Sequence, residues 1–258
     1  MRWRVPFVLA VLAQVTPPMM AVQALALQYN WRIAHKMPVW FHRLVLKLLR
    51  VRVRIEGAPA PDRPLLIVSN HLSWLDIVVI GAAFPVSFIA KAEVGTWPLI
   101  GTFARMQRSV FIDRTRRTAT RDAHAAMTAR LAQGDPLVLF AEGTTSDGHR
   151  VLPFRSALIG AATSVATEEG PARVQALTVA YPGRAGAETA LPGPDLAWHS
   201  DMDLLPHLKD VIMGPPIQAV LRFGTPVAIA PEGDRKALAR DLEAEIARTY
   251  DALRLGPV

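Results

Sequence analysis

Beyond residue 50, short apolar runs alternate along the chain with longer segments whose apolar positions recur at helical spacing. Short runs bounded by turn residues predict strands, and a spacing of about 3.6 residues predicts helices. The expected strands are 51–56, 64–69, 86–90, 109–113, 136–141, 174–181 and 217–223, and the expected helices are 73–83, 97–106, 116–133, 155–168, 204–213 and 234–253. This alternation predicts the α/β fold class, a mostly parallel sheet flanked by helices. The Gly- and Pro-rich segment 182–200 predicts a long surface loop.

The chain before residue 38 has a different pattern. Val5 to Leu27 forms an uncharged stretch that Thr16, Pro17 and Pro18 interrupt. Each half is shorter than the roughly 20 residues that span a bilayer. We therefore expect one kinked span or a shallow hairpin that enters and leaves one leaflet, and a cleaved signal peptide is the alternative. The division that follows is an apolar membrane anchor or re-entrant hairpin at 1–37 and a single α/β domain at 38–258.

Residues 40–50 predict a basic amphipathic helix at the start of that domain. Its apolar residues fall at helical spacing, with Arg43, Lys47 and Arg50 beside them. A helix of this kind suits the surface of an anionic membrane. An ordinary helix that faces the core and has a solvated basic edge fits the same pattern.

The net charge of +7 is concentrated at the N-terminus. Residues 1–54 contain nine Lys or Arg and no Asp or Glu, which leaves 20 basic against 22 acidic residues in the remainder. A basic N-terminal segment suits anionic lipid, an acidic protein partner or nucleic acid. We expect no nucleic-acid partner, because the rest of the chain has no basic excess and no DNA-binding motif. The absence of cysteine excludes disulfides and thiolate metal sites.

Polar residues follow three of the expected strands. Asn70 and His71 follow the strand at 64–69, and Asp76 comes five positions after His71. In an α/β sheet, ligands bind beyond the carboxyl ends of parallel strands. A histidine there can act as a general base, and a carboxylate bonded to one ring nitrogen fixes its tautomer. The alternative is a strand-end histidine and a carboxylate that stabilises a helix N-terminus.

The other two strand ends carry an arginine and a Glu-Gly-Thr turn. Arg114 follows the strand at 109–113 and suits phosphate or carboxylate, unless it is simply solvated. Glu142, Gly143 and Thr144 follow the strand at 136–141 and offer a carboxylate, a hydroxyl and a flexible backbone, unless they form a surface loop. Motifs of serine hydrolases, P-loop NTPases and zinc peptidases are absent.

These blocks resemble those of the glycerolipid acyltransferases, in particular the lysophosphatidic acid acyltransferase group. The segment 70–76, Asn-His-Leu-Ser-Trp-Leu-Asp, is similar to the family's N-H-x-x-x-x-D signature, and 110–114 and 140–144 are similar to its second and third blocks. The likeness covers roughly residues 38–230.

The resemblance implies a glycerol-3-phosphate acyltransferase-like fold and transfer of a fatty acyl group to the free hydroxyl of 1-acyl-sn-glycerol 3-phosphate. The acyl donor would be acyl carrier protein or a coenzyme A thioester, with no metal or other cofactor. The implied general base is His71, oriented by Asp76. The residues implied to bind the acceptor and shape the site are Asn70, Arg114, Glu142, Gly143, Thr144 and Thr145. The implied location is the inner membrane, with the site facing the cytoplasm.

One departure concerns the acceptor. The family's third block usually continues with arginine after Glu-Gly-Thr, where this chain has Thr145, followed by Ser146, Asp147 and Gly148. A site with one cation fewer and one carboxylate more favours a less anionic head group. This segment is similar to the branch that acylates lyso-ornithine lipid, which is the alternative acceptor. The fourth block also departs, because its proline-valine pair is replaced by Ala176 and Leu177. A lipid-binding protein without catalysis is the alternative from another functional class.

Overall fold

The computed structural model describes residues 3–112, 119–159, 166–167, 170–184, 196–199, 202–228 and 234–255. Its helices are α1 (Arg4–Gln28), α2 (Met37–Leu49), α3 (Leu75–Ala83), α4 (Ile100–Met106), α5 (Ala119–Ala132), α6 (Ser156–Ile159), α7 (Leu204–Met213) and α8 (Arg235–Leu255), with short 3-10 turns η1 (Arg32–His35) and η2 (Ala92–Thr96). Its strands are β1 (Val51–Glu56), β2 (Leu65–Ser69), β3 (Ser87–Lys91), β4 (Val110–Ile112), β5 (Leu137–Phe140), β6 (Ala166–Thr167), β7 (Gly170–Pro171), β8 (Arg173–Arg184), β9 (Ile217–Phe223) and β10 (Val227–Ala228).

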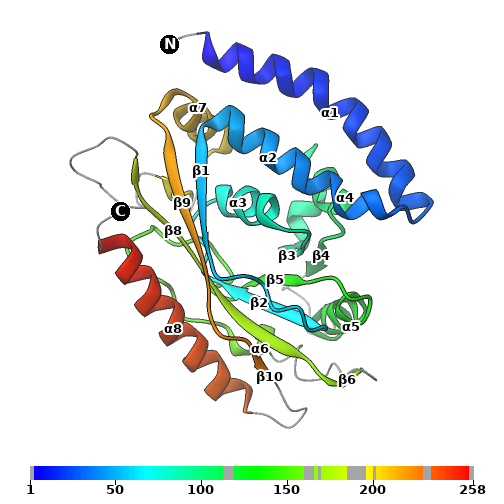
Figure 1. Cartoon of the computed structure of the whole chain (residues 1–258), viewed down its shortest axis with the longest axis vertical. Coiled ribbons are helices and arrows are strands. Elements are labelled where there is room, and N and C mark those ends of the chain that lie inside the picture. Colours follow the sequence, from blue (N-terminus) through cyan, green and yellow to red (C-terminus); the bar gives the residue numbers. More distant parts are fainter. Residues whose placement is uncertain are drawn as a thin grey trace.

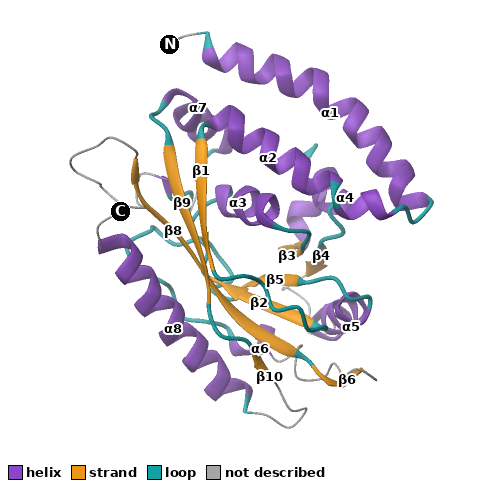
Figure 2. Cartoon of the chain, viewed as in Figure 1, coloured by secondary structure: helices purple, strands orange, loops and turns teal. Residues whose placement is uncertain are grey.

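A mixed, mostly parallel sheet forms the centre of the molecule, as Figures 1 and 2 show. The order of its strands is β1-β9-β8-β2-β5-β3-β4. Neighbours along this order are parallel except β8 and β9, and the short strand β10 pairs antiparallel with β8. The predicted α/β class and mostly parallel sheet are confirmed.

Helices cover both faces of the sheet. Figure 1 shows α2, α3 and α7 on one side and α8 on the other. The strand β2 contacts both layers, because Leu65 and Ile67 belong to one apolar cluster and Leu66 and Val68 to the other. All four side chains are at most 1% exposed. Burial on both faces explains the continuous apolar run that precedes Asn70 in the sequence.

Several sequence expectations differ from the structure at the ends of elements. The helix expected at 155–168 is wrong at its end, because Ala166 and Thr167 form β6, which pairs with β7. The loop expected at 182–200 is wrong at its start, where β8 continues to Arg184. It is also wrong at Leu196 and Ala197, which are buried. Short turns and strand ends depend on tertiary packing more than on local pattern, so local periodicity did not show them.

The helix α2 faces the core. Leu46 and Leu49 are buried in the apolar cluster on the α3 side of the sheet, whereas Arg43 and Lys47 are exposed. Of the two interpretations of segment 40–50, the structure supports a core-facing helix with a solvated basic edge. Its outer surface still exposes Trp40 by 47%.

The helix α1 is continuous and lies along the body. Pro17 and Pro18 are inside this single 25-residue helix, so the two halves do not form a hairpin. The Arg4 guanidinium donates to the carbonyl of Ile212 near one end of α1. Near the other end, the Gln23 side chain donates to the carbonyls of Ala34 and Met106 at 2.9 and 2.8 Å. Figure 1 shows the helix beside α2, over α7 and α4.

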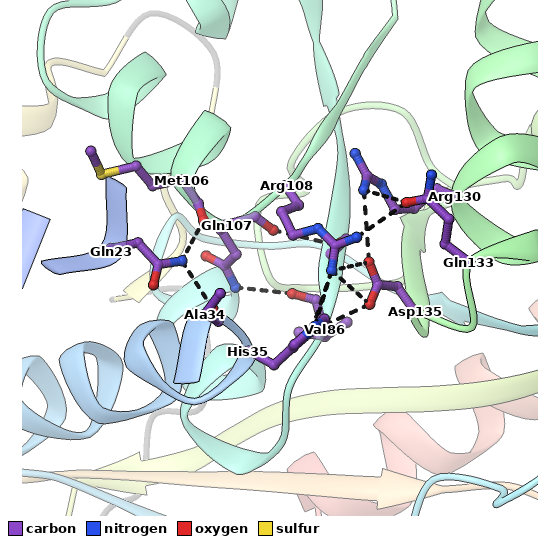
Figure 3. Close-up of polar contacts among 11 residues, drawn as sticks. Gln23, Ala34, His35, Val86, Met106, Gln107, Arg108, Arg130, Gln133 and Asp135 are labelled. Carbon is purple, nitrogen blue, oxygen red and sulfur yellow. Dashed lines mark hydrogen bonds and ion pairs between the residues drawn. The ribbon is translucent and has the colours of Figure 1, made fainter. Parts of the chain in front are cut away.

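A polar cluster joins several elements at the amino-terminal ends of β3, β4 and β5, which is the end of the sheet opposite His71. Figure 3 shows Arg108 directed at the carboxylate of Asp135, which it contacts at 2.9 Å. Gln23 lies at the same end, and Gln107 connects to the carbonyl of Val86. Gln23 of α1 bonds Met106 at the end of α4, and the next two residues bond Val86, just before β3, and Asp135, just before β5. This cluster therefore fixes the apolar helix to the sheet.

Candidate active site

The turn between β2 and α3 is held by the side chain of Asn70. Its amide nitrogen donates to the carbonyl of Val179 at 2.9 Å, and its oxygen accepts from the N–H of Val179 at 2.9 Å. Val179 lies on β8, the parallel neighbour of β2. Asn70 is 2% exposed, and both ends of its amide bond β8. In the structure the Asn70 side chain fastens the turn that carries His71, and its contact with an acceptor stays a prediction.

His71 and Asp76 meet as the sequence predicts. The Nδ1 atom of His71 lies 2.8 Å from Oδ2 of Asp76. The Asp76 carboxylate is fully buried, whereas the His71 side chain is 16% exposed. An Nδ1–H that donates to the carboxylate leaves Nε2 as the acceptor nitrogen of a neutral ring. This tautomer is the one that a general base requires.

The conformation of the turn explains how His71 and Asp76, five residues apart, come into contact. The N–H groups of Leu72 and Ser73 donate to the same Oδ2 atom at 2.8 and 2.9 Å. Asp76 lies in the first turn of α3, where the helix dipole favours a negative charge. The carboxylate therefore orients the imidazole and also holds the turn closed before the helix.

The ring of His71 is further fixed by stacking on Phe140. The two ring centroids are 3.9 Å apart and the planes are inclined by 14°. Phe140 is the last residue of β5 and is paired in register with Ser69 of β2. The parallel pairing of β2 and β5 thus brings two of the predicted strand-end clusters together, as expected.

Glu142 supports His71 through the backbone. Its Oε1 atom accepts the His71 N–H at 2.7 Å, and its Oε2 atom accepts the Leu152 N–H at 3.0 Å. The side chain is 3% exposed, and this burial raises the pKa of Glu142 to about 8. The nearby charge of Asp76 acts in the same direction, and the two N–H donors oppose it.

The loop after Glu142 lies next to the dyad. Gly143 has a φ of 75°, a conformation that suits glycine, so the chain can turn sharply there. Thr144 is exposed and Thr145 is half-buried. The N–H of Ser146 donates to the carbonyl of His71 at 2.8 Å, which fixes the loop beside the histidine. The remaining predicted residue, Arg114, lies outside the described residues.

Two further tyrosines, which the sequence patterns did not single out, bond to the site. Tyr181 on β8 donates its hydroxyl to Oδ1 of Asp76 at 2.7 Å. Tyr250 on α8 donates to the carbonyl of Gly148 at 2.6 Å. Tyr181 is the last residue of the expected strand 174–181. The rule that polar residues at the carboxyl ends of parallel strands form the site would therefore have singled it out. Nothing in the pattern around Tyr250 distinguishes it from a core residue of an amphipathic helix.

Together these contacts form a base, its orienting carboxylate and an adjoining loop at the ends of parallel strands. Nε2 of His71 can accept a proton from a hydroxyl while Asp76 stabilises the imidazolium that results. Among the residues that the structure describes, no group of three His, Cys, Asp or Glu side chains is placed to hold a metal ion. The fold and the dyad define an α/β protein suited to base-assisted transfer to a hydroxyl.

Comparison with known proteins identifies the family. A family model described as "Acyltransferase" matches residues 50–181, which include the dyad, Glu142 and Tyr181. The chain belongs to this acyltransferase family, and it is an acyltransferase.

Two curated relatives and one solved structure show the breadth of the similarity. The chain is 45% identical to the lyso-ornithine lipid O-acyltransferase of Brucella abortus, over 90% of this chain and 87% of the relative. It is 32% identical to the 1-acyl-sn-glycerol-3-phosphate acyltransferase of Neisseria meningitidis serogroup B, over 79% and 76% of the two chains. The crystal structure of the 1-acyl-sn-glycerophosphate acyltransferase of Thermotoga maritima has the same fold, with a TM-score of 0.66, 21% identity and coverage of 98% and 95%.

Proposed function

We propose that this acyltransferase acylates a lysolipid, with His71 as the general base and Asp76 as its orienting group. The observation that carries the proposal is the contact of 2.8 Å between Nδ1 of a partly exposed His71 and a fully buried Asp76. A binding protein has no need of a base in this tautomer. The acyl donor in the proposal is a thioester of acyl carrier protein or coenzyme A, and no further cofactor takes part.

The proposed reaction runs in two steps. The acceptor hydroxyl attacks the thioester carbonyl while its proton moves to Nε2 of His71, and Asp76 stabilises the imidazolium. The tetrahedral intermediate then collapses, the carbon–sulfur bond breaks, and the imidazolium returns its proton to the leaving thiolate. The products are the ester of the lipid and the free thiol.

Within this proposal we favour lyso-ornithine lipid as the acceptor. The relative from Brucella abortus is a lyso-ornithine lipid O-acyltransferase and matches 90% of this chain. A second lyso-ornithine lipid O-acyltransferase, from Rhizobium meliloti, is 37% identical over 89% of this chain. The loop beside His71 agrees, because half-buried Thr145 stands where arginine is usual and exposed Asp147 lies two residues later. A head group less anionic than a phosphate suits that charge better.

The second candidate acceptor is 1-acyl-sn-glycerol 3-phosphate. It is supported by the relative from Neisseria meningitidis, a 1-acyl-sn-glycerol-3-phosphate acyltransferase that matches 79% of this chain.

The proposed location is a membrane surface, with α1 lying along one leaflet. The helix is 25 residues long with a mean hydropathy of 1.8 in its most apolar window, which by length and composition alone is enough to cross a bilayer. Both of its ends are bonded to the body, so a helix about 37 Å long lies along the protein instead of projecting from it. Its outer surface exposes Phe7 and Leu9 by 52% and 50%.

One experiment separates the candidates. Purified protein in lipid vesicles is given an acyl thioester and either lyso-ornithine lipid or 1-acyl-sn-glycerol 3-phosphate at equal mole fraction. We expect faster acylation of lyso-ornithine lipid and loss of both activities in a folded His71→Ala variant. A higher kcat/KM for the phosphate acceptor would transfer the assignment to the second candidate. Full activity of His71→Ala would refute the role of the base.

A further inference from the structure

Among the described residues, Asp76 has one hydrogen-bond partner that lies outside its own segment of chain. Three donors, the His71 ring and the N–H groups of Leu72 and Ser73, converge on Oδ2. The fourth is the hydroxyl of Tyr181, which donates to Oδ1 at 2.7 Å. Within the part of the chain that the structure describes, Oδ2 is thus bonded to the turn and Oδ1 to the sheet.

The sheet register places Tyr181 at this position. Leu177 of β8 is opposite Ser69 of β2, and Val179 bonds to Asn70. Two residues further on, Tyr181 lies on the same face of the strand and belongs to the same apolar cluster as Leu177 and Val179. It is 1% exposed, so its ring is core and only the hydroxyl has a polar partner.

Burial and the neighbouring Asp76 charge raise the pKa of Tyr181 well above its ordinary value. The hydroxyl thus remains protonated and acts toward Asp76 only as a donor. A carboxylate held at one oxygen cannot rotate about its Cβ–Cγ bond without breaking that contact. The donor also withdraws electron density that would otherwise strengthen the contact with the imidazole.

We propose that Tyr181 is a positioning residue for acyl transfer, which acts through Asp76 to set both the orientation and the basicity of His71. The inference deepens the proposed function and rests on the roles assigned there to His71 and Asp76. It goes beyond them by adding a third side chain, from the neighbouring strand β8, that positions the dyad.

Other titratable groups near Asp76 have to be separated from this effect. Within the described part of the chain they are His71 in the same turn, Glu142 after β5 and Tyr250 on α8. Because the pKa of Glu142 is raised to about 8, its ionisation overlaps the pH range of interest. Each pH profile is therefore also recorded in a Glu142→Gln background, in which that ionisation is absent.

The first test is Tyr181→Phe, which removes the hydroxyl and keeps the ring. We expect kcat to fall about tenfold with little change in KM for the acceptor, the size expected for one hydrogen bond to a charged group. We also expect the acidic limb of the kcat profile to move up by about half a pH unit. The reason is that a carboxylate with one donor fewer stabilises the imidazolium more, so the base becomes protonated at higher pH.

A second variant changes the donor and preserves the shape. Fluorotyrosine placed at position 181 is a more acidic phenol of nearly the same size, so it donates more strongly to Oδ1. The acidic limb should then move down, in the opposite direction to that of Tyr181→Phe. A residue with a purely structural role would not shift the limb in opposite directions.

The controls are a double-mutant cycle and a distant hydroxyl. In an Asp76→Asn background, Tyr181→Phe should have little further effect on kcat, because its route to His71 is already lost. Ser87→Ala removes another buried hydroxyl, whose contact is with the carbonyl of Gln107 at the other end of the sheet. It should leave the acidic limb in place.

The results distinguish a failure of the inference about Tyr181 from a failure of the proposed function. If His71→Ala is inactive but Tyr181→Phe and the fluorinated protein keep the wild-type limb, the inference about Tyr181 is wrong and the proposed function stands. Full additivity of Tyr181→Phe with Asp76→Asn would also overturn the inference. If His71→Ala is fully active, the proposed function fails, whatever the result at Tyr181.

Discussion

At the scale of single residues, the site contains two buried carboxylates in different surroundings. From the described residues, Asp76 accepts four hydrogen bonds, which come from an imidazole, two N–H groups and a phenol. Glu142 accepts two, both from backbone N–H groups, and lies near the charge of Asp76. Burial therefore raises the pKa of Glu142 to about 8 and makes its ionisation costly in the folded protein.

This shift predicts how stability depends on pH. The pKa of Glu142 rises from an ordinary value of 4.5 to about 8, so between these values the native state holds a proton that the unfolded chain has released. The contribution of Glu142 to the free energy of unfolding therefore falls as pH rises through this range, by at most about 1.4 kcal/mol per pH unit. Glu142→Gln should flatten the dependence. Urea unfolding at several pH values between about 5 and about 8 tests this, and a slope unchanged by the substitution would contradict it.

Thr145 gives a prediction about the acceptor. Thr145→Arg adds a cation in a half-buried position beside the dyad, so kcat/KM for 1-acyl-sn-glycerol 3-phosphate should rise about tenfold. The matched control is Thr144→Arg, which adds the same charge at the exposed neighbouring residue. Kinetics with the phosphate acceptor measure both variants. No gain, or an equal gain in the control, would remove the argument that position 145 selects the head group.

At the scale of elements, the C-terminal helix α8 supports the loop that follows β5. Tyr250 donates to the carbonyl of Gly148, and Glu243 accepts the N–H of Phe154 at 2.7 Å. Gly148 has a φ of 76°, so the loop turns sharply where Tyr250 holds it. The helix lies beyond residues 50–181, so the support for the loop comes from outside the segment that the family model matches.

Removing the bond between Tyr250 and Gly148 should weaken binding of the acceptor more than it slows the acyl-transfer step. Tyr250→Phe leaves the Gly148 carbonyl without that donor and should cost about 1 kcal/mol of stability. We expect KM for the acceptor to rise severalfold while kcat changes less, because the dyad is bonded separately. Steady-state kinetics with the acceptor varied at saturating donor measure the split. A fall in kcat with KM unchanged would argue against a role of α8 in acceptor binding.

The strands and the contacts between them differ in how well the sequence predicts them. The central strands and the meeting of His71, Asp76 and Glu142 followed from apolar runs that end in polar residues, since β2 and β5 are parallel. The bond from Tyr181 to Asp76 did not follow, because it depends on the pairing of β8 with β2 across more than 100 residues. For the N-terminal segment the sequence left a single span and a hairpin open, because the contacts that hold α1 against the body as one helix are tertiary.

At the scale of the whole molecule, the apolar surface is gathered on the side of α1. Exposed apolar side chains occur at the start of this helix, along it, in the turn that follows it and on α2, namely Trp3, Phe7, Leu9, Val22, Leu25, Tyr29, Trp31 and Trp40. Trp and Tyr are the residues that favour the boundary between lipid and water. With the basic residues of the first 54 positions, this surface suits an anionic leaflet.

Membrane binding should therefore depend on this surface. The double variant Phe7→Asp, Leu9→Asp replaces two half-exposed apolar side chains and should weaken binding to anionic vesicles at least tenfold, since each side chain contributes about 1 kcal/mol or more. Vesicle co-sedimentation measures the change. Val227→Asp is the control, because Val227 is 46% exposed on β10, which Figure 1 shows away from α1. Equal loss in the control would mean that α1 is not the membrane surface.

The side chain of Asn70 has a consequence for how the site is built. Its carboxamide is a peptide group carried on a side chain, and it takes both bonds of Val179 that a further stretch of parallel strand would have taken. The hydrogen-bonded ladder between β2 and β8 is thus extended by one pair of bonds, while the main chain after Ser69 leaves the sheet. The proposed base, His71, therefore lies on a segment that is neither strand nor helix, and yet its position is fixed by the sheet. The side-chain amide of Asn70 supplies the rigidity, and the turn leaves the imidazole accessible at the end of the strands.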